Sequence, residues 1–270
     1  MYFKKKECPS CHYTHDEMLD YCPFCGARNE NQQTFKRRHP MTFIPFYKEI
    51  ILALLGFIGF DLISILFQLI FYNAYQENAV RGLMLINTAT YILFFLICIL
   101  ILAPYFKDIL NKFKIGWAYL FGMAGFIVLI SFSTFYGMLT DILYPQGGTG
   151  GNQSSVTQMV LAYPVISIFI IGIIGPICEE CAYRIGLFTL LRRVHPALAY
   201  VGTAFIFGII HFDFSNPDII TELIYLGNYM FGGLTLSFVY EKKGLAASTT
   251  THILNNMLSI LMIVVSRNVA

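Results

Sequence analysis

The stretch MLINTATYILFFLICILILAPYF, residues 84–106, holds no charged side chain in 23 residues. An α-helix rises about 1.5 Å per residue, so a helix of this length can cross the roughly 30 Å of hydrocarbon in a bilayer. Such an uncharged run would expose a large apolar surface to water. We therefore expect residues 84–106 to form a membrane-spanning helix.

The whole chain has the composition of a membrane protein. Of its 270 residues, 56% are hydrophobic and 13% are charged, whereas soluble domains carry about 25% charged residues. Similar apolar segments recur along the chain, so the sequence predicts an all-α polytopic membrane protein with about seven transmembrane helices. The predicted spans lie near residues 49–72, 84–106, 115–140, 159–178 with a helical continuation to about 193, 197–212, 219–240 and 245–266.

The basic residues orient these spans. If the N-terminus is cytoplasmic, Arg81 and Arg267 fall outside and Arg184 within the membrane, which leaves fifteen of the 18 lysines and arginines inside. This asymmetry follows the positive-inside rule and fits an odd number of spans. The chain opens with polar, lysine-rich residues and shows no cleavable signal peptide. We expect a multi-pass protein of the cell membrane with a cytoplasmic N-terminus.

Four cysteines near the N-terminus form two CxxC pairs. CPSC and CPFC are separated by ten residues, and four thiolates in this pattern can converge tetrahedrally on one zinc ion. The predicted metal ligands are Cys8, Cys11, Cys22 and Cys25. Rubredoxin-like iron and a redox dithiol are the alternatives. The spacer is long enough for a small β-hairpin, and metal binding would supply most of the folding free energy of so small a segment.

This segment resembles the short zinc ribbons found at the start of many bacterial membrane proteins. The resemblance covers residues 1–26 and implies a small zinc-ribbon β module that holds a structural zinc. Residues 27–47 are a predicted basic linker, and residues 48–270 are the predicted membrane domain. We expect the ribbon to bind a protein partner or to position a substrate.

Ionisable side chains inside the membrane cost at least about 2.5 kcal/mol each on insertion scales, so each needs a partner or a function. The stretch GPICEECAYRIG, residues 175–186, carries two adjacent glutamates and an arginine. Glu180 and Arg184 are four residues apart, which puts them on one helix face and predicts a structural ion pair. Glu179 is turned by about 100° from Glu180, so one arginine does not easily satisfy both carboxylates. Glu179 is therefore free to face a cavity.

Two further motifs place polar groups on later helices. In FGIIH, residues 207–211, the spacing of four lets the phenylalanine ring pack beside the imidazole of His211. In HILNN, residues 252–256, the same spacing points His252 and Asn256 toward one space. A lone histidine in a membrane helix is more often a satisfied hydrogen-bonding group than a catalyst. Two histidines together with a spare carboxylate and an amide favour a polar functional site.

EECAYR, FGIIH and HILNN, in that order on successive predicted helices, match the patterns EExxxR, FxxxH and HxxxN. This combination resembles the signature of the CPBP intramembrane proteases, the superfamily that contains the Rce1-type CAAX prenyl endopeptidases and the bacterial Abi or bacteriocin-immunity proteins. Each motif alone is a weak signal, and their order supplies the specificity. The resemblance covers about residues 155–266 and implies an intramembrane peptide hydrolase.

The resemblance also implies the roles of six residues. They are Glu179, Glu180, Arg184, His211, His252 and Asn256. The first glutamate and the first histidine would bind and activate a water, and the second histidine and the asparagine would stabilise the tetrahedral oxyanion. The Glu180–Arg184 pair would hold the first glutamate and its helix in place.

The chemistry of peptide hydrolysis fits these residue types. The reaction needs a base for water, and a desolvated carboxylate is a better proton acceptor at neutral pH. A His₂Glu zinc site is the alternative, and the resemblance to the Rce1-type enzymes favours the glutamate mechanism without a catalytic metal. The chain departs from the family pattern at Tyr183 and Ile185, where phenylalanine and glycine are common. This departure puts substrate fit in doubt more than the chemistry.

Two other features have simpler interpretations. The CxxC from Cys178 to Cys181 has no second cysteine pair in the membrane region, so we expect these thiols to pack rather than to bind metal. The segment QGGTGGNQSS, residues 146–155, predicts a flexible solvated linker, with a lid as the alternative.

The leading hypothesis is an endopeptidase that cleaves a membrane-associated peptide or lipidated protein within or near the bilayer. The alternatives are a non-catalytic binding or bacteriocin-immunity protein and a small-solute transporter. A transporter predicts an inverted repeat, and none is visible. A net charge of +2 and the lack of a basic run interleaved with aromatic residues argue against nucleic acid as a partner.

Overall fold

The computed structural model describes residues 5–16, 22–27 and 44–267 of the chain. Most of the predicted basic linker, residues 28–43, lies outside this described part. The N-terminal module contains two short strands, β1 (Lys5–Glu7) and β2 (Thr14–Asp16), which pair in antiparallel register. The hairpin therefore encloses the first CxxC knuckle, and only its second strand lies in the spacer between the cysteine pairs.

The remainder of the described chain is helical, and every predicted span forms a helix. The helices, in chain order, are α1 (Phe46–Leu54), the π-helical η1 (Leu55–Gly59), α2 (Phe60–Ile70), α3 (Tyr72–Glu77), α4 (Ala79–Leu102), the 3₁₀-helical η2 (Ala103–Tyr105), α5 (Phe106–Lys112), α6 (Gly116–Leu143), α7 (Gly151–Ala162), α8 (Pro164–Phe169), the π-helical η3 (Ile170–Ile174), α9 (Gly175–Glu179), the π-helical η4 (Glu180–Phe188), α10 (Thr189–Val194), α11 (Pro196–Ile209), α12 (Ile219–Lys243) and α13 (Leu245–Arg267).

Five continuous helices in the described part are long and apolar enough to cross a membrane. They are Phe46–Ile70, Ala79–Lys112, Gly116–Leu143, Pro164–Val194 and Leu245–Arg267. The other two predicted spans differ: α11 has 14 residues, about 21 Å of helix, and α12 is long enough but not apolar enough by the same measure. The membrane architecture is confirmed, whereas the count of seven spans stays a prediction.

The outer surface of the helices explains how they meet lipid. Large apolar side chains such as Leu69, Leu100, Ile127 and Ile142 are more than half exposed on α2, α4 and α6. Water would penalise so much exposed apolar surface, and a bilayer would not. The buried polar side chains, such as Glu180, Arg184 and Glu222, instead lie between the helices.

The fourth span departs locally from α-helical geometry. It runs from Pro164 to Val194 and contains the two π-helical stretches η3 and η4. The EECAYR motif therefore lies at an α-to-π junction, and π-bulges are frequent at functional sites. The prediction of an α-helical face was wrong in this detail, yet Glu180 and Arg184 still approach each other.

Helix α1 packs closely on η4 and supports the motif from behind. A Cβ at Gly186 would lie 2.7 Å from the backbone nitrogen of Ala53, so only glycine permits this approach. The Tyr183 hydroxyl donates to the Gly56 carbonyl at 2.7 Å. Tyr183, one of the two departures from the family pattern, thus anchors η4 to the first span.

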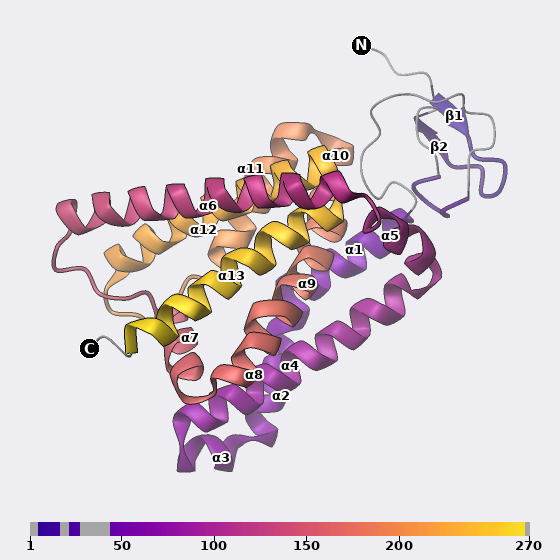
Figure 1. The fold of residues 1–270 in the computed structure, drawn as a ribbon. Helices are drawn as coiled ribbons and strands as arrows, with labels where there is room; N and C mark the ends of the chain where they lie inside the picture. The colour runs from indigo at the N-terminus through magenta and orange to yellow at the C-terminus, as the bar shows by residue number, and fades with distance from the viewer. Residues whose placement is uncertain (1–4, 17–21, 28–43, 268–270) are drawn as a thin grey trace.

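Figure 1 shows how the helices of the membrane domain are arranged. Helices α6 and α12 run side by side, α13 packs against both, and α7 contacts α4 and α13. Helix α13 lies close to α6, because the Thr251 hydroxyl donates to the Gly122 carbonyl at 2.7 Å and a Cβ at Gly125 would meet the same hydroxyl. This contact fixes the rotation of α13 beside His252.

The segment 146–155 is more ordered than the sequence predicted. Helix α7 begins at Gly151, so the connection that precedes it is short. The backbone N–H of Gly148 donates to the Thr221 hydroxyl at 3.2 Å, and that of Gly151 donates to Glu222 at 2.7 Å. The glycine-rich composition suggested a solvated linker, but a carboxylate on α12 satisfies the start of a helix here.

Candidate active site

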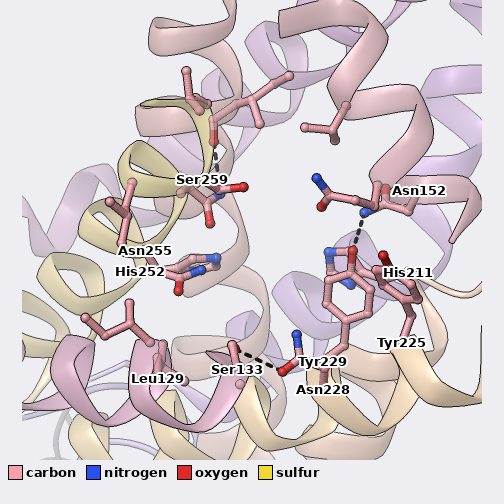
Figure 2. A pocket seen from close by; sticks show the side chains of 18 of the residues that line it. Leu129, Ser133, Asn152, His211, Tyr225, Asn228, Tyr229, His252, Asn255 and Ser259 are labelled. Atoms are coloured by element: carbon pink, nitrogen blue, oxygen red, sulfur yellow. Dashed lines mark hydrogen bonds between the residues drawn. The ribbon is translucent and has the colours of Figure 1, made fainter. Parts of the chain in front are cut away.

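A cavity of about 450 Å³ lies inside the membrane domain, between residues of α4, α6, α7, η3, α9, α11, α12 and α13 (Figure 2). Its lining includes Glu179, His211, His252 and Asn256. The span boundaries predicted from the sequence place His211 near the outer end of its span and His252 closer to the inner end of its own, so their convergence would require tilted helices, a long fourth helix or a re-entrant segment. The structure places both on one cavity, together with the glutamate and the asparagine.

The two adjacent glutamates have different surroundings. The Glu179 side chain is 15% exposed and lines the cavity, whereas that of Glu180 is 1% exposed and lies behind it. One oxygen of Glu179, Oε1, accepts a hydrogen bond from the Tyr91 hydroxyl at 3.1 Å. Its other oxygen, Oε2, lies 3.6 Å from Nε2 of His252. The expectation that Glu179 faces a cavity thus agrees with its position.

Glu180 contacts two cationic or ionisable partners. Its Oε1 lies 3.5 Å from Nε of Arg184 and 3.1 Å from Nδ1 of His252. Arg184 is fully buried, and its guanidinium carbon lies 5.2 Å from the centre of the Phe207 ring. A cation over an aromatic face is attracted by the ring quadrupole. Charge neutralisation and this contact together hold the arginine in the apolar interior.

Phe207 lies at the centre of the site. Its ring centre is 5.0 Å from that of His211 and 5.9 Å from that of His252. The predicted packing of Phe207 beside His211 therefore agrees with the structure. Because the same ring also contacts Arg184, it links the second motif to the first and the third.

The protonation of the His211 ring can be inferred from its backbone contact. Nδ1 lies 2.8 Å from the Phe207 carbonyl oxygen, and a carbonyl can only accept, so Nδ1 carries the proton. In the neutral ring Nε2 is then an acceptor. The ring stacks on Tyr229, with centroids 4.4 Å apart and planes 18° apart. This stacking fixes the direction of the free nitrogen.

His252 and Asn256 are both held by partners on the fourth span. Each ring nitrogen of His252 faces one of the two glutamates. The Asn256 amide donates to the Ile171 carbonyl in η3 at 3.0 Å. One N–H of that amide remains, because an NH₂ group has two donors.

Several residues of the cavity were missed by the sequence analysis. They are Tyr91, Ser133, Asn152, Asn228 and Tyr229. The Asn152 amide donates to the Tyr229 hydroxyl at 2.9 Å, and the Ser133 hydroxyl donates to the Asn228 side-chain oxygen at 3.0 Å (Figure 2). No spacing within one helix connects these residues, because they meet only through tertiary packing. Their side chains are also uncharged at neutral pH, so no charged group marks them in apolar sequence.

A second polar cluster holds α7 beside the cavity. Glu222, which is 1% exposed, accepts hydrogen bonds from the backbone N–H of Gly151 and Asp213 and from the Asn216 amide, at 2.7, 3.0 and 2.6 Å. Asp218 caps α12, and the hydrogen bond from the Thr221 hydroxyl is the main cause of its lowered pKa. The sequence placed Glu222 inside a span, but it fastens the connection between helices instead.

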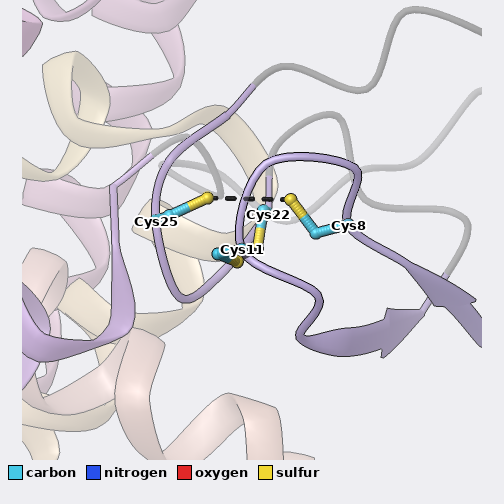
Figure 3. A group of neighbouring side chains, drawn as sticks. All are labelled: Cys8, Cys11, Cys22 and Cys25. Carbon is cyan, nitrogen blue, oxygen red and sulfur yellow. Dashed lines mark hydrogen bonds between the residues drawn. The ribbon is translucent and has the colours of Figure 1, made fainter.

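The four N-terminal cysteines form a separate candidate metal centre (Figure 3). Their sulfur atoms all lie within 4.8 Å of one another, with Cys8 and Cys25 3.7 Å apart and Cys11 and Cys22 3.5 Å apart. Four sulfurs at about 2.3 Å from a central zinc span tetrahedral edges of roughly 3.8 Å. The donor set and its dimensions therefore fit a metal ion.

The thiols of this cluster differ in their readiness to ionise. Burial opposes ionisation of Cys8, but hydrogen bonds from the backbone of Ser10 and Cys11 lower its pKa to about 7. Burial raises the pKa of Cys22 to about 12. Metal binding would have to displace the proton of Cys22, which couples metal affinity to pH.

The membrane cavity has a different donor arrangement. Within the described ranges, the four ribbon cysteines are the one group of three or more His, Cys, Asp or Glu side chains whose ligand atoms converge closely enough for a metal ion. Glu179, His211 and His252 do not form such a group. Cys178 and Cys181 are buried, and the Cys178 thiol lies 3.8 Å from the Tyr91 carbonyl, in keeping with a packing role.

This fold and site define a class: a polytopic membrane protein with a carboxylate, two imidazoles and an amide around an internal cavity. Residues 161–258 match the family model described as type II CAAX prenyl endopeptidase Rce1-like. The resemblance predicted from the three motifs is therefore confirmed over that segment. The matched residues include all three motifs and exclude Tyr91.

A curated protein is also similar over a longer stretch. The chain is 24% identical over 192 residues to the "Putative membrane peptidase YdiL" of Bacillus subtilis (strain 168), which covers 69% of this chain and 75% of the relative. No solved structure matched the chain. Together the family match and this relative support a peptidase of the membrane.

Proposed function

We propose that the protein is an intramembrane endopeptidase that hydrolyses a peptide bond in a membrane-associated peptide or protein. The observation that carries the proposal is that Glu179 and His211 line one cavity with an acceptor atom each left available. Oε1 of Glu179 is engaged by Tyr91 and Nδ1 of His211 by a backbone carbonyl. Oε2 of Glu179 lies 3.6 Å from Nε2 of His252 and has no closer partner among the described residues, so this oxygen and Nε2 of His211 are the atoms proposed to accept from a substrate water.

In this proposal the two acceptors share one water molecule. Each of its hydrogens points to one acceptor, Oε2 of Glu179 or Nε2 of His211, so that an oxygen lone pair faces the peptide carbonyl. Glu179 removes a proton as the water attacks, and it returns this proton to the leaving amine. Both atoms at the scissile bond are then accounted for: the carbonyl carbon gains the hydroxyl, and the nitrogen gains a proton.

His252 and Asn256 are the proposed donors to the tetrahedral oxyanion. Asn256 has one N–H left after its bond to the Ile171 carbonyl. For His252, a neutral ring that donates Nδ1–H to Glu180 has a bare Nε2, so donation from Nε2 needs the doubly protonated ring. Glu180 and Arg184 act as positioning residues in this scheme, because Glu180 contacts the Nδ1 side of that ring and Arg184 contacts Glu180.

We propose a glutamate mechanism without a catalytic metal. The support is the arrangement of the donors, because Glu179, His211 and His252 do not converge as metal ligands do among the described residues. A structural zinc is proposed for Cys8, Cys11, Cys22 and Cys25, where the sulfur spacing fits the ion. The zinc would stabilise the small module that precedes the membrane domain.

The substrate is proposed to be a peptide or lipidated protein that enters from lipid or from the cytoplasmic side. The family name refers to prenylated proteins, but the relative is bacterial and the ribbon resembles those of bacterial membrane proteins. Pheromone, bacteriocin, lipidated or signal-derived peptides are therefore the proposed substrate classes. The proposed location is the plasma membrane of a bacterium, with the N-terminus in the cytoplasm, as the basic residues predict.

The test is a comparison of membrane peptidomes from cells that express the wild type or Glu179→Ala. The proposal predicts peptides that appear only with the wild type and precursors that accumulate with the variant. A binding or immunity protein of the same fold would keep its function in a folded Glu179→Ala variant. Identical peptidomes at equal protein levels would contradict the proposal.

A further inference from the structure

A second cavity of about 240 Å³ adjoins the first between α6 and α12, at the end of α6 that leads into the connection to α7. The two cavities share three lining residues, Ser133, Tyr225 and Asn228. The two spaces therefore meet at these residues, and we call them together the α6–α12 cleft. Nothing in the proposed reaction uses the second part of this cleft.

The cleft follows one face of α6. Leu129 and Ser133 line its first part, and Ser133, Gly137 and Asp141 line its second part. These positions are four apart and therefore lie one above the other on the helix. A Cβ at Gly137 would meet no atom within 4 Å, and the same holds for Gly232 on α12. The space beside both glycines is therefore open.

Most polar groups of the second part already have partners. The Tyr136 and Thr140 hydroxyls donate to the backbone carbonyls of Ile224 and Gly137, respectively. The Tyr144 and Thr221 hydroxyls both donate to the Asp218 carboxylate. The exceptions are informative. The Asn228 side-chain oxygen accepts from Ser133, so its NH₂ group is left to donate. The Asp141 carboxylate has no hydrogen bond or ion pair with any residue that the structure describes.

Among the residues that the structure describes, no basic side chain forms an ion pair with Asp141. The two arginines predicted on the same side of the membrane have other contacts: Arg81 lies 3.8 Å from Glu77, and Arg267 donates to the Leu161 carbonyl. Asp218 and Glu222 add further negative charge near the cleft. An anionic ligand would be repelled here, whereas a cationic group would be attracted.

The dimensions suit an extended peptide. From Ser133 to Asp141 the helix advances eight residues, or about 12 Å, which an extended chain covers in three or four residues. Amide donors such as Asn228 suit backbone carbonyls, which an extended peptide presents along its length. A peptide with its scissile bond beside Glu179 would thus reach Asp141 no sooner than three or four residues away.

We propose that the α6–α12 cleft binds the polar part of the peptide substrate in extended form, and that Asp141 selects a lysine or arginine side chain there. This inference rests on the proposed endopeptidase function and adds the substrate class: a peptide with a cationic residue at least three or four positions from the scissile bond. Asn228 donates to the substrate backbone between the two ends of the cleft.

Binding to a non-cleaving variant tests the cleft independently of catalysis. Fluorescein-labelled peptides with one apolar segment carry lysine, alanine or glutamate at each position from two to seven residues beyond that segment. Their Kd values are measured with Glu179→Gln protein in liposomes at low ionic strength. The proposal predicts that lysine binds about two- to fivefold more tightly than glutamate at one or two positions, the size expected for a contact with an exposed carboxylate such as that of Asp141.

Substitutions that remove or reverse the charge of Asp141 test whether this carboxylate causes the preference for lysine. In the Glu179→Gln background, Asp141→Asn should abolish the preference for lysine and Asp141→Lys should reverse it toward glutamate. Asp108→Asn, on α5 and outside the lining of the cleft, is the matched control and should leave the preference intact. Equal Kd values for lysine and glutamate at every position, or a preference that survives Asp141→Lys, would overturn the proposal.

Cleavage separates this inference from the proposed function. With wild-type protein the same peptides should be cleaved with the same charge preference in KM. Charge-selective binding without cleavage would support the cleft and contradict the peptidase, whereas cleavage without charge selectivity would support the peptidase and contradict the cleft. Absence of binding by every peptide would also overturn the cleft.

Discussion

The Tyr91 hydroxyl offers a sharp test of how the proposed base is positioned. Tyr91 lies on α4, outside the segment that matches the family model, and donates to Oε1 of Glu179 at 3.1 Å. Tyr91→Phe removes this one donor and keeps the ring, which contacts Phe60 with a centroid distance of 5.0 Å. The change therefore removes one hydrogen bond to the Glu179 carboxylate and leaves the packing of the ring largely intact.

The expected effect follows from the strength of one hydrogen bond to a charged group. Such bonds contribute about 1.5–3 kcal/mol, and each 1.36 kcal/mol in a barrier changes a rate tenfold. If the bond holds Oε2 toward the water throughout the reaction, kcat should fall by about 10- to 100-fold. KM should stay within about twofold, because the hydroxyl engages Glu179 and not the proposed path of the peptide.

The assay is the hydrolysis of an internally quenched peptide by purified protein in liposomes, with kcat and KM measured separately. Tyr119→Phe is the matched control, because its hydroxyl donates to the Phe113 carbonyl at an exposed site on α6. Thermal unfolding of both variants shows whether they are folded. An unchanged kcat in Tyr91→Phe, or a rise in KM alone, would refute the positioning role.

Three further predictions concern stability and metal. Arg184→Ala should lower the stability by about 3–5 kcal/mol, because it removes the buried cation beside Glu180 and leaves that carboxylate only its contact with His252; an unchanged melting temperature would argue against the buried pair. Glu222→Ala should speed hydrogen exchange at the start of α7 by removing the acceptor of the Gly151 N–H, and exchange at the wild-type rate would show that α7 is held otherwise. Replacing all four ribbon cysteines by serine should remove one equivalent of zinc and leave none in the membrane domain; stoichiometric zinc retained there, measured by mass spectrometry, would contradict the metal-free mechanism.

The local sequence motifs predicted several contacts of the candidate site. Spacings of four predicted that Phe207 packs beside His211 and that Glu180 pairs with Arg184, and both contacts occur. These spacings are informative because residues on one helical turn meet whatever the rest of the chain does. The position of Glu179 on the cavity follows from the same geometry, since a neighbour of Glu180 points in another direction.

The remaining features depend on tertiary packing. Tyr91 reaches Glu179 from a helix 88 residues earlier, and no pattern within either helix records that contact. The π-helical shift in η4 was also invisible, because apolar periodicity does not reveal a change of backbone hydrogen bonding. The glycine-rich composition predicted a flexible linker around Gly151. A helix begins there instead, because Glu222 accepts a hydrogen bond from the Gly151 N–H in its first turn.

The contacts of His252 modify the expectation drawn from the family resemblance. The resemblance implied a donor to the oxyanion, but the ring here lies between Glu179 and Glu180. Each of its two ring nitrogens therefore contacts a glutamate when no peptide is bound. In our proposal, the Nε2 side turns to the oxyanion when substrate occupies the cavity, whereas the contact of Nδ1 with Glu180 persists.

Glu179 is the proposed base for hydrolysis in the membrane cavity. The most direct measurement is the rate of cleavage of a quenched peptide library in liposomes by the wild type and by Glu179→Gln, which keeps the size of the side chain. Loss of a general base typically costs about 10²–10⁴-fold in rate, and we expect a decrease in kcat of that size with the fold intact. A folded Glu179→Gln protein that cleaves at the wild-type rate would contradict the account.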